Sequence, residues 1–200
     1  MKRTIFAISA AAVLGLVGLT ASLSGQDAGQ QRQQQRLQQQ VELPTDGVAV
    51  LSPTRGSEVR GVILFQQEGD VLRLTGKIVG LTPGLHGFHI HEFGDLRDPQ
   101  GQSAGDHFNP TGHKHGGPTD AEHHAGDLGN IEADQNGEAT VNVEAPWLKL
   151  HYVVGRSLVV HEGQDDLKSQ PSGDAGGRAA LGVIGIAQAE QERQANRHAR

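Results

Sequence analysis

Eight of the eleven histidines of this chain fall within one stretch, residues 85–127. Near its start, His89 and His91 alternate with the apolar Phe88 and Ile90. A β-strand directs the side chains at i and i+2 to the same face, so this spacing predicts two imidazoles side by side on one strand. Two imidazoles fixed in this way make half of a metal site. The fold must therefore return further ligands to this strand from elsewhere in the chain.

The further ligands are expected from the Gly- and Pro-rich segment that follows, residues 92–126, and from its end. The candidates there are His107, His115, His124 and Asp127. Histidine nitrogens with a single carboxylate suit zinc or copper, whereas magnesium and calcium prefer shells of oxygen. The stretch thus predicts a site for transition metals.

Short runs with β-type patterns, separated by turn signals, predict the fold. The expected strands are 48–51, 57–66, 71–79, 87–91, 128–132, 139–143, 157–160 and 181–187. Eight short strands without a convincing helix favour an all-β fold, an antiparallel eight-stranded Greek-key sandwich or flattened barrel. Two segments, 92–126 and 162–180, exceed ordinary loop lengths, and loops this long are usually functional or disordered.

The two ends of the chain differ in composition from this domain, which is expected over residues 46–188. Residues 1–24 have a basic start, an apolar run and small residues, as is typical of a signal peptide for export to the periplasm or the outside of the cell. The alternative is a membrane anchor, which would tether the chain if the segment stays uncleaved. A Gln-rich linker at 25–45 and a polar tail at 189–200 flank the domain. The formal net charge of −6 argues against nucleic acid as a partner.

Several segments of the chain, in order and with compatible spacing, resemble the signature segments of copper/zinc superoxide dismutases. They are GFHIHEFGD at 87–95, SAGDHFNP at 103–110, HGGP at 115–118, HAGDLGN at 124–130, GRSLVVHE at 155–162 and GVIGIA at 182–187. The resemblance runs from about residue 48 to residue 188, and the exported type is the one that the N-terminal segment suggests.

The resemblance implies two metal shells that share one histidine. The copper ligands would be His89, His91, His107 and His161, and the zinc ligands would be His107, His115, His124 and Asp127. Asp165 falls where the family has a carboxylate that hydrogen-bonds one ligand histidine of each metal, here His89 and His115. Arg178 corresponds to the arginine beside the copper channel, with Lys168 as a further candidate cation. His86, His113, His123, His151 and His198 have no ligand role in the match.

The chain departs from the family in one respect, because it contains no cysteine. The family usually ties the long metal loop to the final strand by a disulfide, and the positions near Gln102 and at Leu181 lack both partners. A tether of that size ordinarily contributes a few kcal/mol, on the order of 3 to 4. Its absence raises the question of what holds the loop and of whether the chain forms a homodimer.

The resemblance implies an enzyme that converts two superoxide anions to oxygen and hydrogen peroxide by Cu(II)/Cu(I) cycling. The catalytic groups would be Arg178 and His107, the histidine that bridges copper and zinc. A second hypothesis is a non-catalytic periplasmic protein that binds copper or zinc on the same scaffold. A third is a structural envelope protein anchored through the Gln-rich linker. Intact shells together with Asp165 and Arg178 favour the enzyme.

Overall fold

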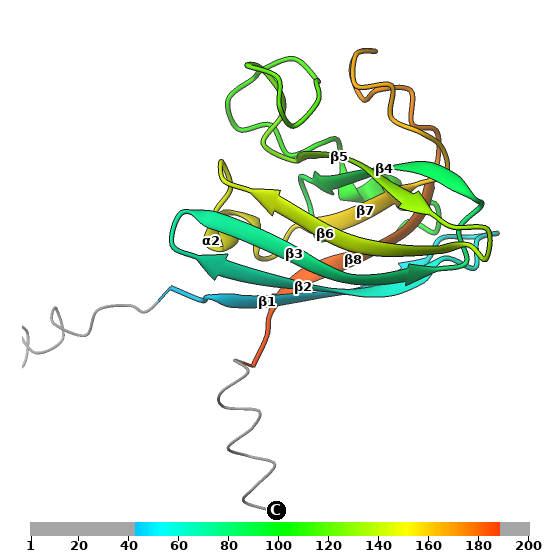
Figure 1. Ribbon diagram of the computed structural model, residues 1–200, viewed down its shortest axis with the longest axis horizontal. Helices are drawn as coiled ribbons and strands as arrows, with labels where there is room; N and C mark the ends of the chain where they lie inside the picture. The colour runs from blue at the N-terminus through cyan, green and yellow to red at the C-terminus, as the bar shows by residue number, and fades with distance from the viewer. Residues whose placement is uncertain (1–42, 189–200) are drawn as a thin grey trace, which may run out of the picture. The chain divides into compact units, whose positions relative to one another are not determined.

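The structure is a computed structural model that describes residues 43–188. The expected signal peptide, nearly all of the Gln-rich linker and the C-terminal tail lie outside the described residues. Eight strands, all antiparallel, form the fold (Figure 1): β1 Asp46–Pro53, β2 Arg60–Glu68, β3 Val71–Val79, β4 Gly84–His91, β5 Asp127–Ala133, β6 Glu138–Ala145, β7 Ser157–His161 and β8 Arg178–Ile186. The all-β prediction is confirmed, with one strand for each of the eight expected runs.

The strands close into a barrel in the order β1-β2-β3-β6-β5-β4-β7-β8. Because β3 lies beside β6 while β4 lies beside β7, the chain crosses over in the manner of a Greek key. The pairing of β5 with β6 is short, with the single partner pair Ala133 and Ala139. The alternating pattern of the strands directs one face inward to an apolar core that includes Phe65, Leu72 and Ile184.

Two short helical turns interrupt the connections between strands, η1 Gln102–Ala104 and α2 Leu150–Val153. The first lies within the long loop between β4 and β5. We call this loop, residues 92–126, the histidine loop. The second long loop joins β7 to β8 at residues 162–177. It ends three residues earlier than expected, because Arg178 pairs with His161 as the first residue of β8. In the described part of the chain no helix is long and apolar enough to cross a membrane.

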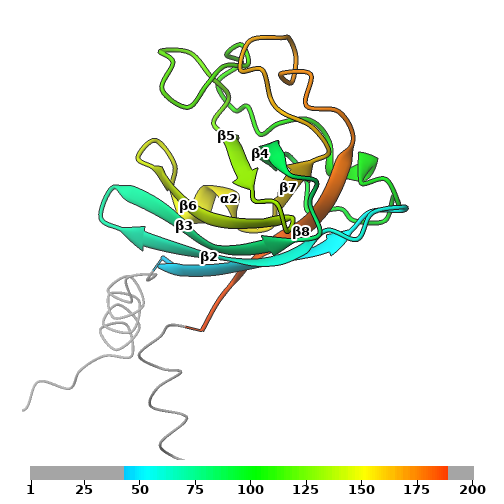
Figure 2. The ribbon, with the colours of Figure 1, turned by 45° about the vertical axis from the view of Figure 1, so that its right-hand side comes forward.

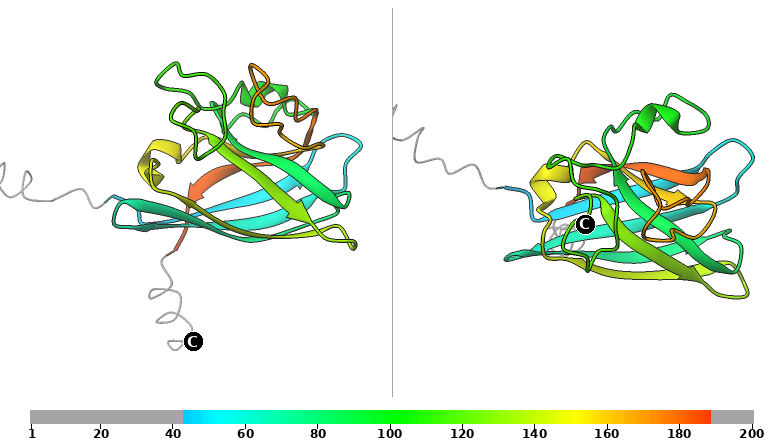
Figure 3. Two further views of the ribbon diagram at one scale, coloured as in Figure 1. Left: turned by 45° about the horizontal axis from the view of Figure 1, so that its top comes forward. Right: turned by 90° about the horizontal axis from the view of Figure 1, so that it is seen from above.

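Both long loops rise on the same side of the barrel, over the ends of β4, β5 and β7 (Figures 1 and 2). The views in Figure 3 also place the histidine loop beside the β7–β8 loop. Gln170 joins them, since its side-chain oxygen accepts the His115 N–H at 2.9 Å and its side-chain nitrogen donates to the His115 carbonyl at 2.9 Å. This arrangement returns residues of both loops to the paired histidines of β4.

Candidate metal centre

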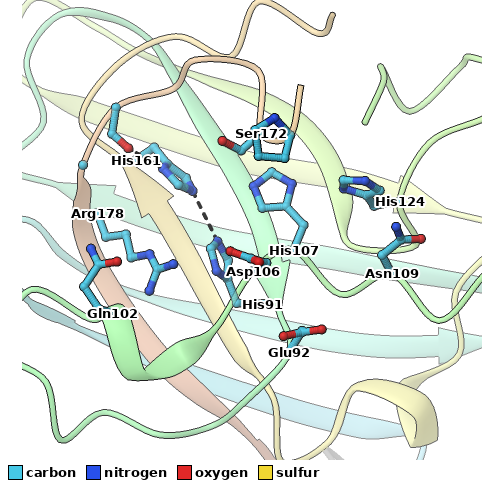
Figure 4. A pocket seen from close by; sticks show the side chains of 13 residues that line it. His91, Glu92, Gln102, Asp106, His107, Asn109, His124, His161, Ser172 and Arg178 are labelled. Carbon is cyan, nitrogen blue, oxygen red and sulfur yellow. Dashed lines mark hydrogen bonds between the residues drawn. The ribbon is translucent and has the colours of Figure 1, made fainter. Parts of the chain in front are cut away.

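The structure brings the predicted ligands together into two groups on the loop side of the barrel. The four-histidine cluster consists of His89, His91, His107 and His161, and the aspartate cluster consists of His107, His115, His124 and Asp127. Within each cluster the candidate ligand atoms all lie within 4.8 Å of one another. Every member is buried. His107 belongs to both clusters and lies between His91 and His124 in Figure 4.

Strand β4 sets the geometry of the four-histidine cluster. His89 and His91 lie on the same face of β4, and β4 pairs with β7, which ends at His161. The backbone of His107 forms an isolated antiparallel bridge with His91, which docks the histidine loop against the end of the strand. The Nε2 atoms of His91 and His161 are 3.3 Å apart. The pairing of β4 with β7 therefore positions His89, His91 and His161, and the bridge from the histidine loop positions His107.

The outer nitrogens of the rings on β4 and β7 are occupied by protein acceptors. His91 Nδ1 donates to the Gly105 carbonyl at 2.9 Å, and His161 Nδ1 donates to the Gly176 carbonyl at 3.2 Å. His89 Nε2 donates to the Asp165 carboxylate at 2.7 Å. A carbonyl or carboxylate oxygen can only accept, so each outer nitrogen carries the proton and the inner nitrogen keeps its lone pair. All three inner nitrogens are thus prepared to bind a cation.

Several inner nitrogens have no hydrogen-bond partner although they are buried. Among the described residues these are His89 Nδ1, His107 Nε2, His115 Nδ1 and His124 Nδ1. A buried polar atom without a hydrogen-bond partner destabilises the folded state. Four such atoms in one place are therefore unusual in a folded protein unless a ligand binds them. All four belong to the two clusters, which is the pattern expected when a metal ion completes their coordination. The residues present therefore fit metal ions at both clusters.

Burial keeps three imidazoles of the four-histidine cluster, those of His89, His91 and His161, neutral at neutral pH. Burial, which disfavours the charged form, lowers the pKa of His89 to about 4 and that of His161 to about 3. Burial also lowers the pKa of His91 well below its ordinary value, and the neighbouring His107 adds to this effect. At neutral pH the inner nitrogens consequently need no deprotonation before they bind a metal.

The aspartate cluster attracts positive charge instead. Burial would raise the pKa of Asp127, but the hydrogen bond with His107 and the proximity of His115 outweigh it and hold the pKa well below the usual range. Burial lowers the pKa of His115, yet Asp127 and Asp165 outweigh that effect and raise it to about 9. His115 Nδ1 lies 3.1 Å from Asp127 Oδ2 without hydrogen-bond geometry, as expected of atoms directed at a shared point. The charge of this cluster thus favours a bound metal cation.

Asp165 connects the two clusters. Its Oδ2 accepts from His89 at 2.7 Å and its Oδ1 accepts from His115 at 3.0 Å. Asn130 holds the backbone on both sides, because it accepts the Asp165 N–H at 2.8 Å and donates to the Asp165 carbonyl at 2.9 Å. Gly173, with φ of 69°, packs directly on the carboxylate, and a Cβ there would lie 1.8 Å from Asp165 Oδ1. Asp165 is therefore fixed on all sides and orients one ring of each cluster.

A cavity of about 370 Å³ opens onto the four-histidine cluster, with His91, His107 and His161 in its wall. Arg178 also lines it, and of the described lining residues Arg178 alone has a cationic side chain (Figure 4). Lys168, which the sequence suggested as a further cation, is not among the lining residues. Of the aspartate cluster, only His107 and His124 reach this cavity.

The cavity also contains residues that the sequence analysis did not select. Glu92 and Asp106 are the acidic ones, and Gln102 and Asn109 are neutral. Glu92 directly follows His91 and Asp106 directly precedes His107, so adjacency to predicted ligands was the signal that could have identified them. Gly105 was also missed, although its carbonyl accepts from both His91 and Arg178. Such a backbone role has no side-chain signature in a sequence.

Comparison with known proteins assigns this centre to a family. The family model for copper/zinc superoxide dismutase (SODC) matches residues 59–184, which is more than half of the chain. The chain belongs to the copper/zinc superoxide dismutase family. The resemblance stated from the sequence motifs is thereby confirmed, and copper and zinc are the metals of this family.

The relatives include two kinds of protein. The chain is 49% identical over 154 residues to the extracellular superoxide dismutase (Cu-Zn) of Onchocerca volvulus, and the match covers 70% of this chain and 75% of the relative. It is also 45% identical over 150 residues to the copper chaperone for superoxide dismutase of Rattus norvegicus, with 72% of this chain covered. The chaperone of Mus musculus is 45% identical over 151 residues. The chain spans about half, 54%, of the length of each chaperone.

Proposed function

We propose that the chain is a superoxide dismutase, which converts two superoxide anions and two protons to oxygen and hydrogen peroxide. One observation carries the proposal: the cavity that reaches His91, His107 and His161 is lined by the cationic Arg178. A protein that only stores or delivers a metal has no need of a guanidinium beside it, whereas an enzyme with an anionic substrate does. The aspartate cluster has no comparable opening toward Asp127, which is fully buried.

The donor sets assign the metals in this proposal. The four-histidine cluster offers only imidazole nitrogens, which suit copper, and copper supplies one-electron redox chemistry when it is bound. The aspartate cluster offers three nitrogens and one carboxylate oxygen, which form the closed tetrahedral shell of a structural zinc site. His107 offers one nitrogen to each cluster, since Nδ1 faces Asp127 at 2.7 Å and Nε2 has no protein partner.

Arg178 binds the anion in this mechanism. One terminal nitrogen donates to the Gly101 carbonyl and the other donates to the Gly105 carbonyl at 2.5 Å. A guanidinium has five N–H donors, so this side chain is fixed and still has donors for superoxide. Burial lowers the pKa of Arg178, while the charges of Asp106 and Asp98 oppose that effect. An arginine stays protonated at physiological pH even so.

His107 handles a proton in this mechanism. His107 lines the cavity, and its buried Nε2 is the nitrogen without a protein partner. The reaction consumes two protons per cycle, one for each oxygen of the peroxide. Nε2 accepts one proton in the half-reaction that releases oxygen and donates it to the second superoxide, and water supplies the other. Asp127 holds the opposite nitrogen, so the ring keeps its orientation during the transfer.

The second candidate is a copper-binding protein without turnover, and the identity to the two chaperones favours it. Those relatives extend well beyond the part that this chain matches, so the shared part alone does not carry their function to this chain. We also propose, from residues 1–24, that the chain acts in the periplasm or outside the cell.

The experiment is pulse radiolysis of the copper- and zinc-loaded protein over a series of salt concentrations, with Arg178→Lys and Arg178→Glu as variants. We expect the parent to consume superoxide catalytically, Arg178→Lys to retain most of the rate, and Arg178→Glu to lose about 10- to 100-fold with both metals retained. The rate of Arg178→Glu should rise with salt, because screening then weakens repulsion. A loaded parent that binds both metals but does not turn over superoxide would refute the proposal and favour the copper-binding candidate.

A further inference from the structure

The histidine loop is held against β8 by an apolar contact. Leu181 of β8, Val159 of β7 and Ala104 of η1 form a small buried cluster of their own. Gly101, which precedes η1, lies against the same leucine: a Cβ built on Gly101 would be 3.0 Å from Leu181 Cδ1. Gly101 has φ of 78°, a left-handed conformation that glycine adopts without strain. The position opposite Leu181 is thus Gly101 and not Gln102, whose side chain is exposed.

The segment in contact with Leu181, residues 101–105, supplies the carbonyls that hold two groups of the site. The Gly101 carbonyl accepts from Arg178, and the Gly105 carbonyl accepts from Arg178 at 2.5 Å and from His91 Nδ1 at 2.9 Å. A displacement of this segment would therefore move the guanidinium and release the outer nitrogen of one ring. Both effects act at the cavity side of the four-histidine cluster.

Besides Leu181, the hydrogen bonds from Arg178 of β8 and His91 of β4 to the Gly101 and Gly105 carbonyls tie the segment to the barrel, and these are the bonds that the packing of Leu181 would support. The chain has no cysteine to close the loop covalently. The backbone bonds from Phe93 to Ala104 and from Glu92 to Asp106, each 2.9 Å, join the histidine loop to itself. The Arg55 N–H donates to the Pro99 carbonyl at 2.7 Å, which fixes the loop before the segment begins.

We propose that Leu181 is a positioning residue, a non-covalent anchor whose packing against Gly101 and Ala104 holds Arg178 and His91 in place. The expected effect on rate rests on the proposed dismutase function. The anchoring itself does not, because it can be measured without turnover. Its physical basis is that a buried leucine fills the space between strand and loop, and that truncation leaves a void into which the loop can shift.

The experiment compares Leu181→Ala with Leu72→Ala in the full chain loaded with copper and zinc. Leu72 is a fully buried leucine of β3 that packs in the barrel core, so it controls for loss of core packing. Leu181→Met, which conserves volume, tests for rescue. If Leu181→Ala does not fold, Leu181→Val provides the same comparison with a smaller deletion.

We measure hydrogen exchange at the Phe93, Ala104 and Gly105 amides, the copper(II) absorption spectrum, and the second-order rate with superoxide. For Leu181→Ala we expect exchange at these amides to rise at least about tenfold over Leu72→Ala. We also expect a shifted copper(II) band and a rate about tenfold lower with both metals retained. Leu181→Met should match the parent, and Leu72→Ala should melt earlier without these three changes.

Two results have distinct meanings. If Leu181→Ala exchanges at these amides no faster than Leu72→Ala and keeps the parental spectrum, the anchor proposal is overturned. If the parent itself does not turn over superoxide, the proposed function fails alone, and the exchange and spectral comparison still decides the anchor.

Discussion

The two clusters share His107 but differ in charge, closure and support. In the four-histidine cluster, burial lowers the pKa of His89, His91 and His161 and keeps these rings neutral, and the cluster opens to a cavity lined by Arg178. The aspartate cluster carries the charge of Asp127, whereas Asp165 borders both clusters, through His89 and through His115. A neutral, accessible set of nitrogens suits a metal that exchanges electrons with a small anion. A charged, enclosed set suits a metal that holds two loops together.

The largest expected effect comes from the substitution of one histidine in each cluster, which should remove one metal and leave the other. His161→Ala should abolish dismutation and remove copper while zinc remains, because His161 belongs only to the four-histidine cluster. His115→Ala should remove zinc first, because it belongs only to the aspartate cluster. Elemental analysis of each variant, with the parent binding one copper and one zinc per chain, checks this. If His115→Ala leaves the metal content of a one-metal parent unchanged, the two-site interpretation is wrong.

Removal of both metals should lower the midpoint of thermal unfolding strongly. Ligands bound only by the folded state stabilise it by mass action, by about 4 kcal/mol at a concentration one thousand times the Kd. Both long loops contribute residues to the clusters or to their support, so removal of the metals takes away the ions that would join the loops to the strands. Calorimetry with and without chelator measures the shift. Reductant alone should leave the midpoint unchanged, because the chain has no cysteine; a reductant-sensitive midpoint in metal-free buffer would contradict this.

The metal-free chain should respond to pH with opposite signs at the two clusters. The folded-state pKa of His89 is about 4 and that of His161 about 3, below the ordinary 6.5, so the unfolded chain binds more protons in this range. Stability should therefore fall by about 3 kcal/mol for each of these two rings as the pH drops from about 6.5 toward 4. His115, with its pKa raised to about 9, contributes stability below 6.5 that is lost as the pH rises through 9.

Denaturant unfolding of the metal-free protein between pH 4 and pH 9.5 tests both signs. His161→Gln should flatten the acid limb, and His115→Gln should flatten the alkaline limb. A parent stability that is constant from pH 4 to pH 7 would show that the rings of the four-histidine cluster are not kept neutral by burial.

The strands and the candidate ligands of residues 89–127 could be predicted from local spacing, whereas His161 and the division into two ligand sets came from the family resemblance. His89 and His91 follow the period of a strand, and the motifs around His107 and His124 are contiguous. The loop contacts could not be predicted in the same way. The sequence placed the position opposite Leu181 only near Gln102, and the left-handed turn at Gly101 decides that Gly101 is the residue that faces β8. Lys168 was expected near the cavity, but the path of the β7–β8 loop excludes it from the lining.

The smallest expected effect concerns the acidic residues of the open cluster. Asp106 lines the cavity with Glu92, and its charge acts on Arg178. A carboxylate at this place repels superoxide and lowers the local positive potential that draws an anion inward. Asp106→Asn should therefore raise the second-order rate about two- to threefold at low ionic strength, with unchanged metal content.

The gain of Asp106→Asn should disappear near 1 M salt, where the Debye length falls to about 3 Å. Glu58→Gln is the matched control. Glu58 is exposed in the connection between β1 and β2, so this substitution removes the same single charge away from the cavity. Pulse radiolysis of both variants over a salt series makes the comparison. If Glu58→Gln accelerates the reaction as much as Asp106→Asn, the net charge of the chain governs the approach of superoxide. In that case the open side of the four-histidine cluster has no local field of its own, and the contrast between the two clusters reduces to their donor atoms.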